Sequence, residues 1–179
     1  MGSRPSVASD VSMNTVLSAE MSAKYIAPDV IRNMLTHTKT IAMVGLSPKK
    51  QRPSNFVASY LQYEGYRVIP VNPRATEILG EKAYPDLLSI PDEIDMVNVF
   101  RRPEECPVIA EQAVAIGAKS LWLQLRVVSL QAAQIAEAGN MQVVMDRCVK
   151  IEHGRYNGSL HWVGMNTEII SARKAKRFI

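Results

Sequence analysis

Residues 40–53, with the sequence T-I-A-M-V-G-L-S-P-K-K-Q-R-P, carry the residue types that bind a phosphate group. Gly45 permits a sharp turn after an apolar run, because a residue without a Cβ adopts a positive φ at little steric cost. Pro53 suits the first turn of a helix, whose free amides and dipole favour an anion. The intervening loop contains three cations, Lys49, Lys50 and Arg52. We therefore predict a phosphate-binding loop at this position.

Strand-like apolar runs alternate with helix-like segments along the chain. The strands are expected at residues 41–44, 67–71, 94–100, 120–123 and 141–145. The helices are expected at residues 28–36, 54–64, 103–116 and 130–138. Residues 76–88 are expected to form a loop with a short helical piece. Such alternation indicates parallel strands joined by helical crossovers. The sequence therefore predicts a single doubly wound, Rossmann-like α/β domain. Its five-stranded sheet is mainly parallel and has helices on both faces, and Pro70 indicates either the end of the second strand or an edge of the sheet.

In such a sheet the ligand binds beyond the carboxyl ends of the strands, near the point where strand order reverses. These ends are Gly45 and residues 72–74, 100–102, 124–126 and 146–148, which together hold several arginines and one acid, Asp146. Arginine offers a planar, charged fork for phosphate and stacks on aromatic bases. Each arginine could instead pair with a surface acid such as Glu104, Glu105 or Glu137. The gathering of arginines at one edge favours a nucleotide site.

The two predicted loops nearest the first strand narrow the choice of nucleotide. A site for NAD has the pattern G-x-G-x-x-G and an acid after the second strand. This chain has one glycine in the first turn, and Asn72, Pro73 and Arg74 after the second strand. Arg74 suits an additional phosphate on the ribose, which leaves NADP or coenzyme A. The pattern G-x-x-x-x-G-K-[ST] is absent, so ATP hydrolysis has no support.

Composition indicates a globular protein without a broad nucleic-acid surface. The chain has 179 residues, is 47% hydrophobic and has a net charge of +4. Near the C-terminus stand four cations, Arg173, Lys174, Lys176 and Arg177, which account for that charge. Nucleic acid is thus not an expected partner. Two cysteines without metal-ligand spacing, and no apolar run long enough to span a membrane, indicate a cytoplasmic protein.

The chain is expected to divide into three parts. Residues 1–22 are interpreted as a mobile leader, residues 23–157 as the nucleotide-binding domain, and residues 158–179 as a packing segment with a basic tail. The apolar residues Trp162, Val163, Ile169 and Ile170 would pack either on the domain or on a second subunit. The sequence leaves a homo-oligomer and a separate protein partner both open.

Six segments together carry a resemblance to a known family. They read I-A-M-V-G-L-S-P-K, G-Y-R-V-I-P-V-N-P, I-L-G-E-K-A-Y, V-F-R-R-P-E, L-W-L-Q-L and V-V-M-D-R-C-V-K-I-E-H. In this order they resemble the small stand-alone coenzyme A-binding proteins, which are similar to the coenzyme A-binding domain of succinyl-CoA synthetase. The resemblance covers about residues 26–156.

The resemblance implies that coenzyme A is bound by residues at four strand ends. It assigns ligand contacts to Gly45, Ser47, Arg52, Asn72, Pro73, Arg74, Phe100, Arg101 and Gln124, beside which Lys49 adds charge. The first three would handle the pyrophosphate and the next three the adenosine. Phe100 and Arg101 would line the cleft, Gln124 would close its far side, and residues 146–148 would form its floor. The family has glycine where this chain has Arg126, so that Arg126 either reaches solvent or a phosphate, or narrows the pocket.

No catalytic residue or metal ligand is assigned. None of the three histidines, His37, His153 and His161, lies in a glycine-rich phosphohistidine loop, and His153 is expected on the outer surface or at a cap. Arg147 could lower the pKa of the Cys148 thiol, but a buried, inert cysteine is the commoner case. We therefore favour a protein that binds coenzyme A or an acyl-CoA without chemistry of its own. The alternative is an NADP-dependent reductase or an acyl-CoA-processing enzyme that uses Cys148.

Overall fold

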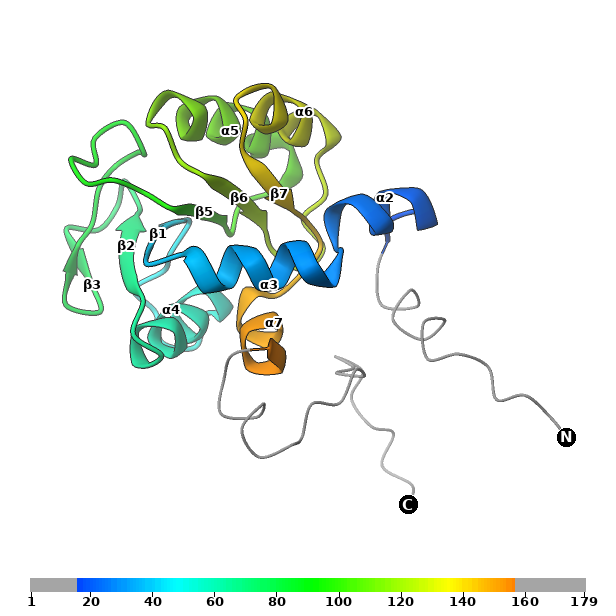
Figure 1. The fold of residues 1–179 in the computed structure, drawn as a ribbon. Helices are drawn as coiled ribbons and strands as arrows, with labels where there is room; N and C mark the ends of the chain where they lie inside the picture. Colours follow the sequence, from blue (N-terminus) through cyan, green and yellow to red (C-terminus); the bar gives the residue numbers. More distant parts are fainter. Residues whose placement is uncertain (1–15, 157–179) are drawn as a thin grey trace, which may run out of the picture.

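The computed structural model describes residues 16–156, which form a doubly wound α/β domain (Figure 1). Its five-stranded sheet has the order β2-β1-β5-β6-β7, and all of its strand pairs are parallel. The strands are β1 (Thr40–Val44), β2 (Arg67–Val71), β5 (Met96–Val99), β6 (Ser120–Leu123) and β7 (Gln142–Val144). The predicted fold class is thus confirmed, and β2 is an edge strand, one of the two alternatives that Pro70 left open.

Helices cover both faces of the sheet and enclose two separate cores. On one face lie α5 (Cys106–Ala115) and α6 (Leu130–Ala138). On the other lie α3 (Pro28–His37), α4 (Pro53–Tyr63) and α7 (Val149–Tyr156). In α3, the helical spacing of Ile31, Met34 and Leu35 gives one apolar stripe, and all three side chains are buried. Hydrophobic burial therefore fixes this helix against the sheet.

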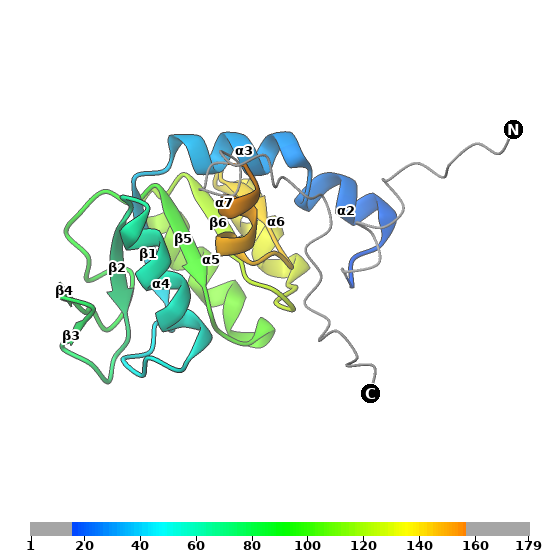
Figure 2. The same cartoon turned by 90° about the horizontal axis from the view of Figure 1, so that it is seen from below.

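The segment from residue 76 to residue 88 differs from the prediction. Instead of a helical piece it contains a β-hairpin, with β3 at Glu77–Ile78 and β4 at Glu81–Lys82, which lies beyond the edge strand β2 (Figure 2). Leu79 and Gly80 form its turn with φ angles of 54° and 78°. Two consecutive positive φ angles are typical of the tight turn that joins antiparallel strands. The predicted helical piece is wrong because the backbone turns here in the left-handed region.

The last residues of the predicted mobile leader are helical in the structure. Residues 1–15 lie outside the described residues, but α2 (Ala19–Tyr25) begins within the segment that we expected to lack structure. Ser18 caps this helix by accepting a hydrogen bond from the amide of Met21 at 3.3 Å. Leu17 and Tyr25 are buried in the core beneath α5 and α6. The predictions for residues 158–179 lie outside the described residues.

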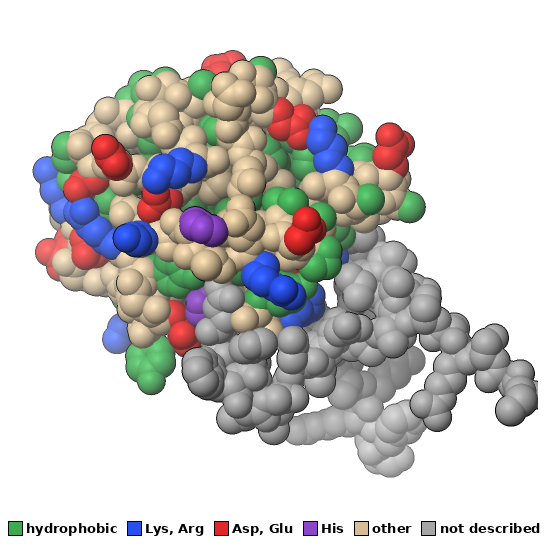
Figure 3. All heavy atoms as spheres, in the orientation of Figure 1, with side chains coloured by type: hydrophobic (Ala, Val, Ile, Leu, Met, Phe, Trp, Pro, Cys, Tyr) green, Lys and Arg blue, Asp and Glu red, His purple; other side chains and the backbone are tan. Residues whose placement is uncertain are grey.

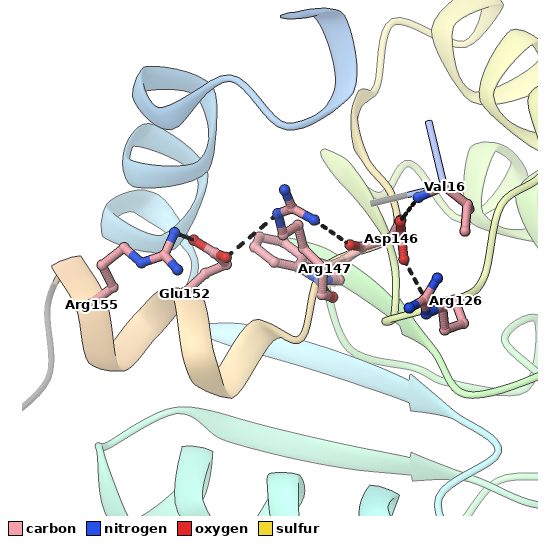
Figure 4. A network of polar contacts seen from close by, with 7 residues as sticks. Val16, Arg126, Asp146, Arg147, Glu152 and Arg155 are labelled. Atoms are coloured by element: carbon pink, nitrogen blue, oxygen red, sulfur yellow. Dashed lines mark hydrogen bonds and ion pairs between the residues drawn. The ribbon is translucent and has the colours of Figure 1, made fainter. Parts of the chain in front are cut away.

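The last helix, α7, was absent from the prediction because its sequence, V-K-I-E-H-G-R-Y, has few apolar residues. Two of its polar side chains, Glu152 and His153, are buried instead. Glu152, which is 2% exposed, lies between Arg147 and Arg155, at 3.7 Å and 3.2 Å (Figure 4). Burial raises the pKa of Glu152, and the two arginines oppose that shift. The two arginines therefore offset part of the cost of burying the Glu152 carboxylate.

Candidate functional site

A cleft of about 990 Å³ opens at the carboxyl ends of β1, β2 and β5. It lies between the β1–α4 loop, the segment after β2 and the start of η1 (Pro103–Glu105), the 3₁₀ turn that precedes α5. Nine of the ten predicted site residues line it: Gly45, Ser47, Lys49, Arg52, Asn72, Pro73, Arg74, Phe100 and Arg101. This is the edge at which a doubly wound sheet binds ligands.

Gly45 ends β1 in a conformation that only glycine fits. Its φ is +84°, and a Cβ added there would lie 2.6 Å from the carbonyl oxygen of Phe100 and 2.9 Å from Cδ of Arg101. Its amide donates to the carbonyl of Val71 at 3.0 Å. The β1 turn therefore contacts the chain that leaves β5 and the chain that leaves β2, and it draws these cleft walls together.

The β1–α4 loop is held against the first turn of α4 by side-chain hydrogen bonds. The amide of Ser47 donates to Oγ of Ser54 at 3.1 Å, and Nδ2 of Asn55 donates to the carbonyl of Ser47 at 2.9 Å. The helix itself begins after Arg52 without a side-chain cap. Uncapped amides at a helix start carry the positive end of the helix dipole. These hydrogen bonds thus fix the β1–α4 loop to the start of α4.

Asn72 connects the second wall of the cleft to the first. Its Nδ2 donates to the carbonyl of Leu46 at 2.8 Å, and its Oδ1 accepts from the amide of Arg74 at 2.8 Å. Both ends of the amide are therefore occupied by backbone groups. Asn72 lines the cleft, as expected, while its side chain holds the loops in place.

The cations of the cleft differ in their partners. Arg101 forms a two-point ion pair with Glu105, in which Nε lies 2.9 Å from Oε2 and Nη2 lies 2.6 Å from Oε1. This hydrogen-bonded pairing holds the pKa of Glu105 below its ordinary value. Within residues 16–156, by contrast, the side chains of Lys49, Arg52 and Arg74 form no ion pair or hydrogen bond. Pairing with surface acids therefore explains Arg101 but not the other three.

Gln124 and residues 146–148 do not reach the cleft. Gln124 is 4% exposed, and its Nε2 donates to Oδ1 of Asn98 at 2.8 Å. Asp146 accepts from the amides of Val16 and Arg126, at 2.9 Å and 2.7 Å (Figure 4). The sheet order explains why these residues lie outside the cleft, because β6 and β7 lie on the far side of β5 from β1. The far wall and floor predicted from these residues are not part of the cleft.

Arg126 occupies a backbone position that favours glycine. Its φ is 67°, in the left-handed region, and its side chain is exposed and outside the cleft lining. Of the two alternatives for Arg126, a narrowed pocket is therefore wrong.

His153 and the two thiols have structural surroundings. His153 is buried between Tyr60 and Tyr66, with ring centroids at 5.6 Å and 5.3 Å, so its expected surface position is wrong. The hydroxyl of Tyr60 lies 3.0 Å from its Nδ1, and burial lowers the pKa of the imidazole. Burial likewise raises the pKa of the Cys148 thiol, and it raises that of Cys106 to about 11. Neither cysteine is activated as a nucleophile.

Residues 16–156 contain neither a cluster of metal ligands nor a membrane-spanning helix. Across residues 16–156, no three His, Cys, Asp or Glu side chains gather so that they could hold a metal ion. None of the helices described is long and apolar enough to cross a membrane. On the face shown in Figure 3, acidic and basic side chains are interspersed rather than gathered by sign.

The parallel sheet, the glycine turn at the end of β1 and the cationic cleft define a Rossmann-like nucleotide-binding domain. The chain belongs to the family described as "CoA binding domain", which it matches over residues 39–154.

Several known proteins are similar to this chain. The protein YneT of Bacillus subtilis is 42% identical over 123 residues, which cover 69% of this chain and 91% of YneT. An ADP-forming acetate–CoA ligase of Archaeoglobus fulgidus, form II, is 32% identical over 97 residues, which cover 53% of this chain but only 14% of the ligase. A solved structure of a hypothetical protein from Pyrococcus horikoshii is 42% identical with a TM-score of 0.70, and the match covers 73% of this chain and 92% of that one. The family supports coenzyme A as the ligand and gives no support to NADP.

Proposed function

We propose that this chain binds coenzyme A, or an acyl-CoA, in the cleft at the ends of β1, β2 and β5. The observation that carries the proposal is a set of three cations around the turn at Gly45, Lys49, Arg52 and Arg74, whose side chains form no ion pair within residues 16–156. Cations that gather around a concave surface attract an anion to it. Coenzyme A brings a pyrophosphate and a further phosphate on its ribose, so its charge matches that of the cleft.

The loop positions suggest how the ligand lies. The pyrophosphate would bind at the β1–α4 loop, near Gly45, Ser47 and Arg52, where backbone amides and positive charge coincide. The adenosine would border the segment after β2, so that Arg74 can contact the ribose phosphate. Phe100 and Arg101 would line the cleft beside the Gly45 turn, so that Arg101 lies near the pyrophosphate.

A role in binding rather than in chemistry is favoured by the absence of an acid–base set. Among the described residues, the cleft lining contains neither histidine nor cysteine, and its acids are Asp86, Glu104 and Glu105. The carboxylate of Glu105 is paired with Arg101, and burial raises the pKa of the Cys106 and Cys148 thiols. The acetate–CoA ligase of Archaeoglobus fulgidus carries the similar region as a small part of a longer chain. A partner protein would supply any reaction of the bound ligand.

The test is a calorimetric titration of ligand-stripped protein with coenzyme A, NADP and NAD in turn. We expect micromolar binding of coenzyme A and much weaker binding of the dinucleotides. Arg52→Ala should weaken coenzyme A binding by roughly tenfold or more, since a charge-assisted contact contributes about 1.5–3 kcal/mol. Lys50→Ala is the matched control, because Lys50 has the same charge in the same loop but does not line the cleft.

If Arg52→Ala and Lys50→Ala lose the same affinity for coenzyme A, Arg52 contributes only general electrostatic attraction and no specific contact. Tighter binding of NADP than of coenzyme A would overturn the proposed function.

A further inference from the structure

One arginine of the cleft is already oriented by a neighbouring acid. Nε and Nη2 of Arg101 both donate to the carboxylate of Glu105, at 2.9 Å and 2.6 Å. The stem of the arginine lies over the β1 turn, since its Cδ would be 2.9 Å from a Cβ on Gly45. The side chain is thus held at two points, by packing of its stem against Gly45 and by the hydrogen bonds of one guanidinium edge to Glu105.

Glu105 is itself held in place. Its Oε2 also accepts from the backbone amide of Arg102 at 3.2 Å and so completes the first turn of η1. A carboxylate fixed to the backbone in this way has few rotamers to lose. It is therefore a suitable anchor for a long, flexible side chain.

The geometry of the pair leaves the arginine able to bind a second anion. A guanidinium has five N–H donors in one plane. Contact through Nε and one hydrogen of Nη2 uses a single edge of that plane. Both hydrogens of Nη1 and the other hydrogen of Nη2 remain, and the edge formed by Nη1 and Nη2 can donate two hydrogen bonds to a phosphate. Because the two edges differ, the phosphate does not need to displace Glu105.

Two opposing effects decide the sign of the contribution of Glu105. Its negative charge repels a phosphate, but the carboxylate is neutralised by direct contact with Arg101, and solvent screens the rest. Against this, a free arginine would lose rotamer entropy when it closes on the ligand, and the tethered one has lost it already. We propose that Glu105 is a positioning residue that presents Arg101 to a phosphate of the ligand. This inference rests on the proposed function.

Titration of four variants with coenzyme A at fixed ionic strength tests the inference. Glu105→Gln keeps the side-chain length and an oxygen for the Arg102 amide, so that η1 is preserved, which a thermal melt verifies. We expect it to bind coenzyme A about three- to tenfold more weakly than wild type, a coupling typical of contacting residues. Arg101→Ala should bind at least tenfold more weakly. The double variant should bind no more weakly than Arg101→Ala alone.

Glu104→Gln is the matched control for charge. Glu104 also lines the cleft, and its side chain forms no ion pair among the described residues. Its removal should leave binding at least as tight as in wild type, because only a repulsive charge is lost.

The outcomes separate the inference from the proposed function. If wild type binds coenzyme A and Glu105→Gln binds as tightly or more tightly, Glu105 only competes with the phosphate and the inference fails alone. It also fails if Glu105→Gln weakens binding equally in the presence and absence of Arg101. If wild type itself does not bind coenzyme A, the proposed function fails, and the inference fails with it.

Discussion

At the scale of single residues, Gly45 decides whether the cleft can form. A positive φ alone would disfavour other residues by about 1–2 kcal/mol. At Gly45 the carbonyl of Phe100 adds a direct clash, at 2.6 Å from the position of a Cβ. This oxygen belongs to the backbone and cannot rotate away as a side chain would.

Gly45→Ala therefore tests close approach separately from backbone strain. Gly65 is the matched control, because its φ is +94° and nothing lies within 4 Å of an added Cβ. We expect Gly45→Ala to lower the free energy of unfolding by about 2–3 kcal/mol more than Gly65→Ala, since overpacking adds to the strain. Coenzyme A binding should be lost only in Gly45→Ala. Chemical denaturation measures the first effect and calorimetry the second; equal destabilisation by the two variants would remove the clash from the explanation.

Sequence reasoning found the residues of the cleft because their roles depend on local pattern. A glycine after an apolar run, a proline at a helix start and cations between them form one contiguous segment. Gln124 was misplaced because its position depends on the sheet order, which the sequence of its own strand does not encode. The pairing of Arg101 with Glu105 was considered, but local sequence could not decide between a surface acid and a ligand as the partner.

At the scale of elements, regular helices and strands were predictable and the charged helix was not. β6 and α6 have the predicted bounds, because their apolar periodicity and flanking glycine are local signals. The helix α7 depends instead on ion pairs of Glu152 with two arginines, and on aromatic contacts of His153 with α4 and with Tyr66, the residue before β2. Such burial of polar side chains arises only after distant segments have packed.

His153 makes the attachment of α7 sensitive to pH. Its imidazole is buried, and the loss of hydration lowers its pKa below the ordinary value of 6.5. Attraction to the Glu64 carboxylate opposes this shift but is smaller. The unfolded chain therefore binds a proton before the folded chain does. The stability due to neutral His153 is fully present above pH 6.5 and is lost as pH falls through the lowered, folded-state pKa.

His153→Gln should therefore flatten the decline of the free energy of unfolding below about pH 6.5. The variant should also be less stable than wild type at pH 8, because contacts with Tyr60 and Tyr66 are lost. His37→Gln is the control for the loss of one imidazole, since His37 is exposed on α3 and does not pack between tyrosines. Urea denaturation from pH 5 to pH 8 gives these slopes; an unchanged slope in His153→Gln would assign the decline to other groups.

At the scale of the whole molecule, the cleft and the network around Asp146 lie toward opposite edges of the sheet, the cleft at the β2 side and the network at the β7 side. The cleft lies over β2, β1 and β5, whereas Asp146 follows β7 and joins the segment before α2 to the β6–α6 loop (Figures 1 and 4). A change in the network should thus alter stability without altering affinity. Arg126 offers such a change, because it belongs to the network through its backbone amide and not to the cleft.

Arg126→Gly should stabilise the domain and leave coenzyme A binding unchanged. Removal of the left-handed strain gains about 1–2 kcal/mol, and the greater freedom of glycine in the unfolded chain costs about 0.5–1 kcal/mol. The net gain should raise Tm by about 2 °C in a chain of this size. Arg126→Ala keeps a Cβ at the same positive φ and should not raise Tm, which separates backbone strain from loss of the charged side chain. A shift in the Kd of coenzyme A in Arg126→Gly would contradict this separation, since it would mean that the β6–α6 loop communicates with the cleft through β5.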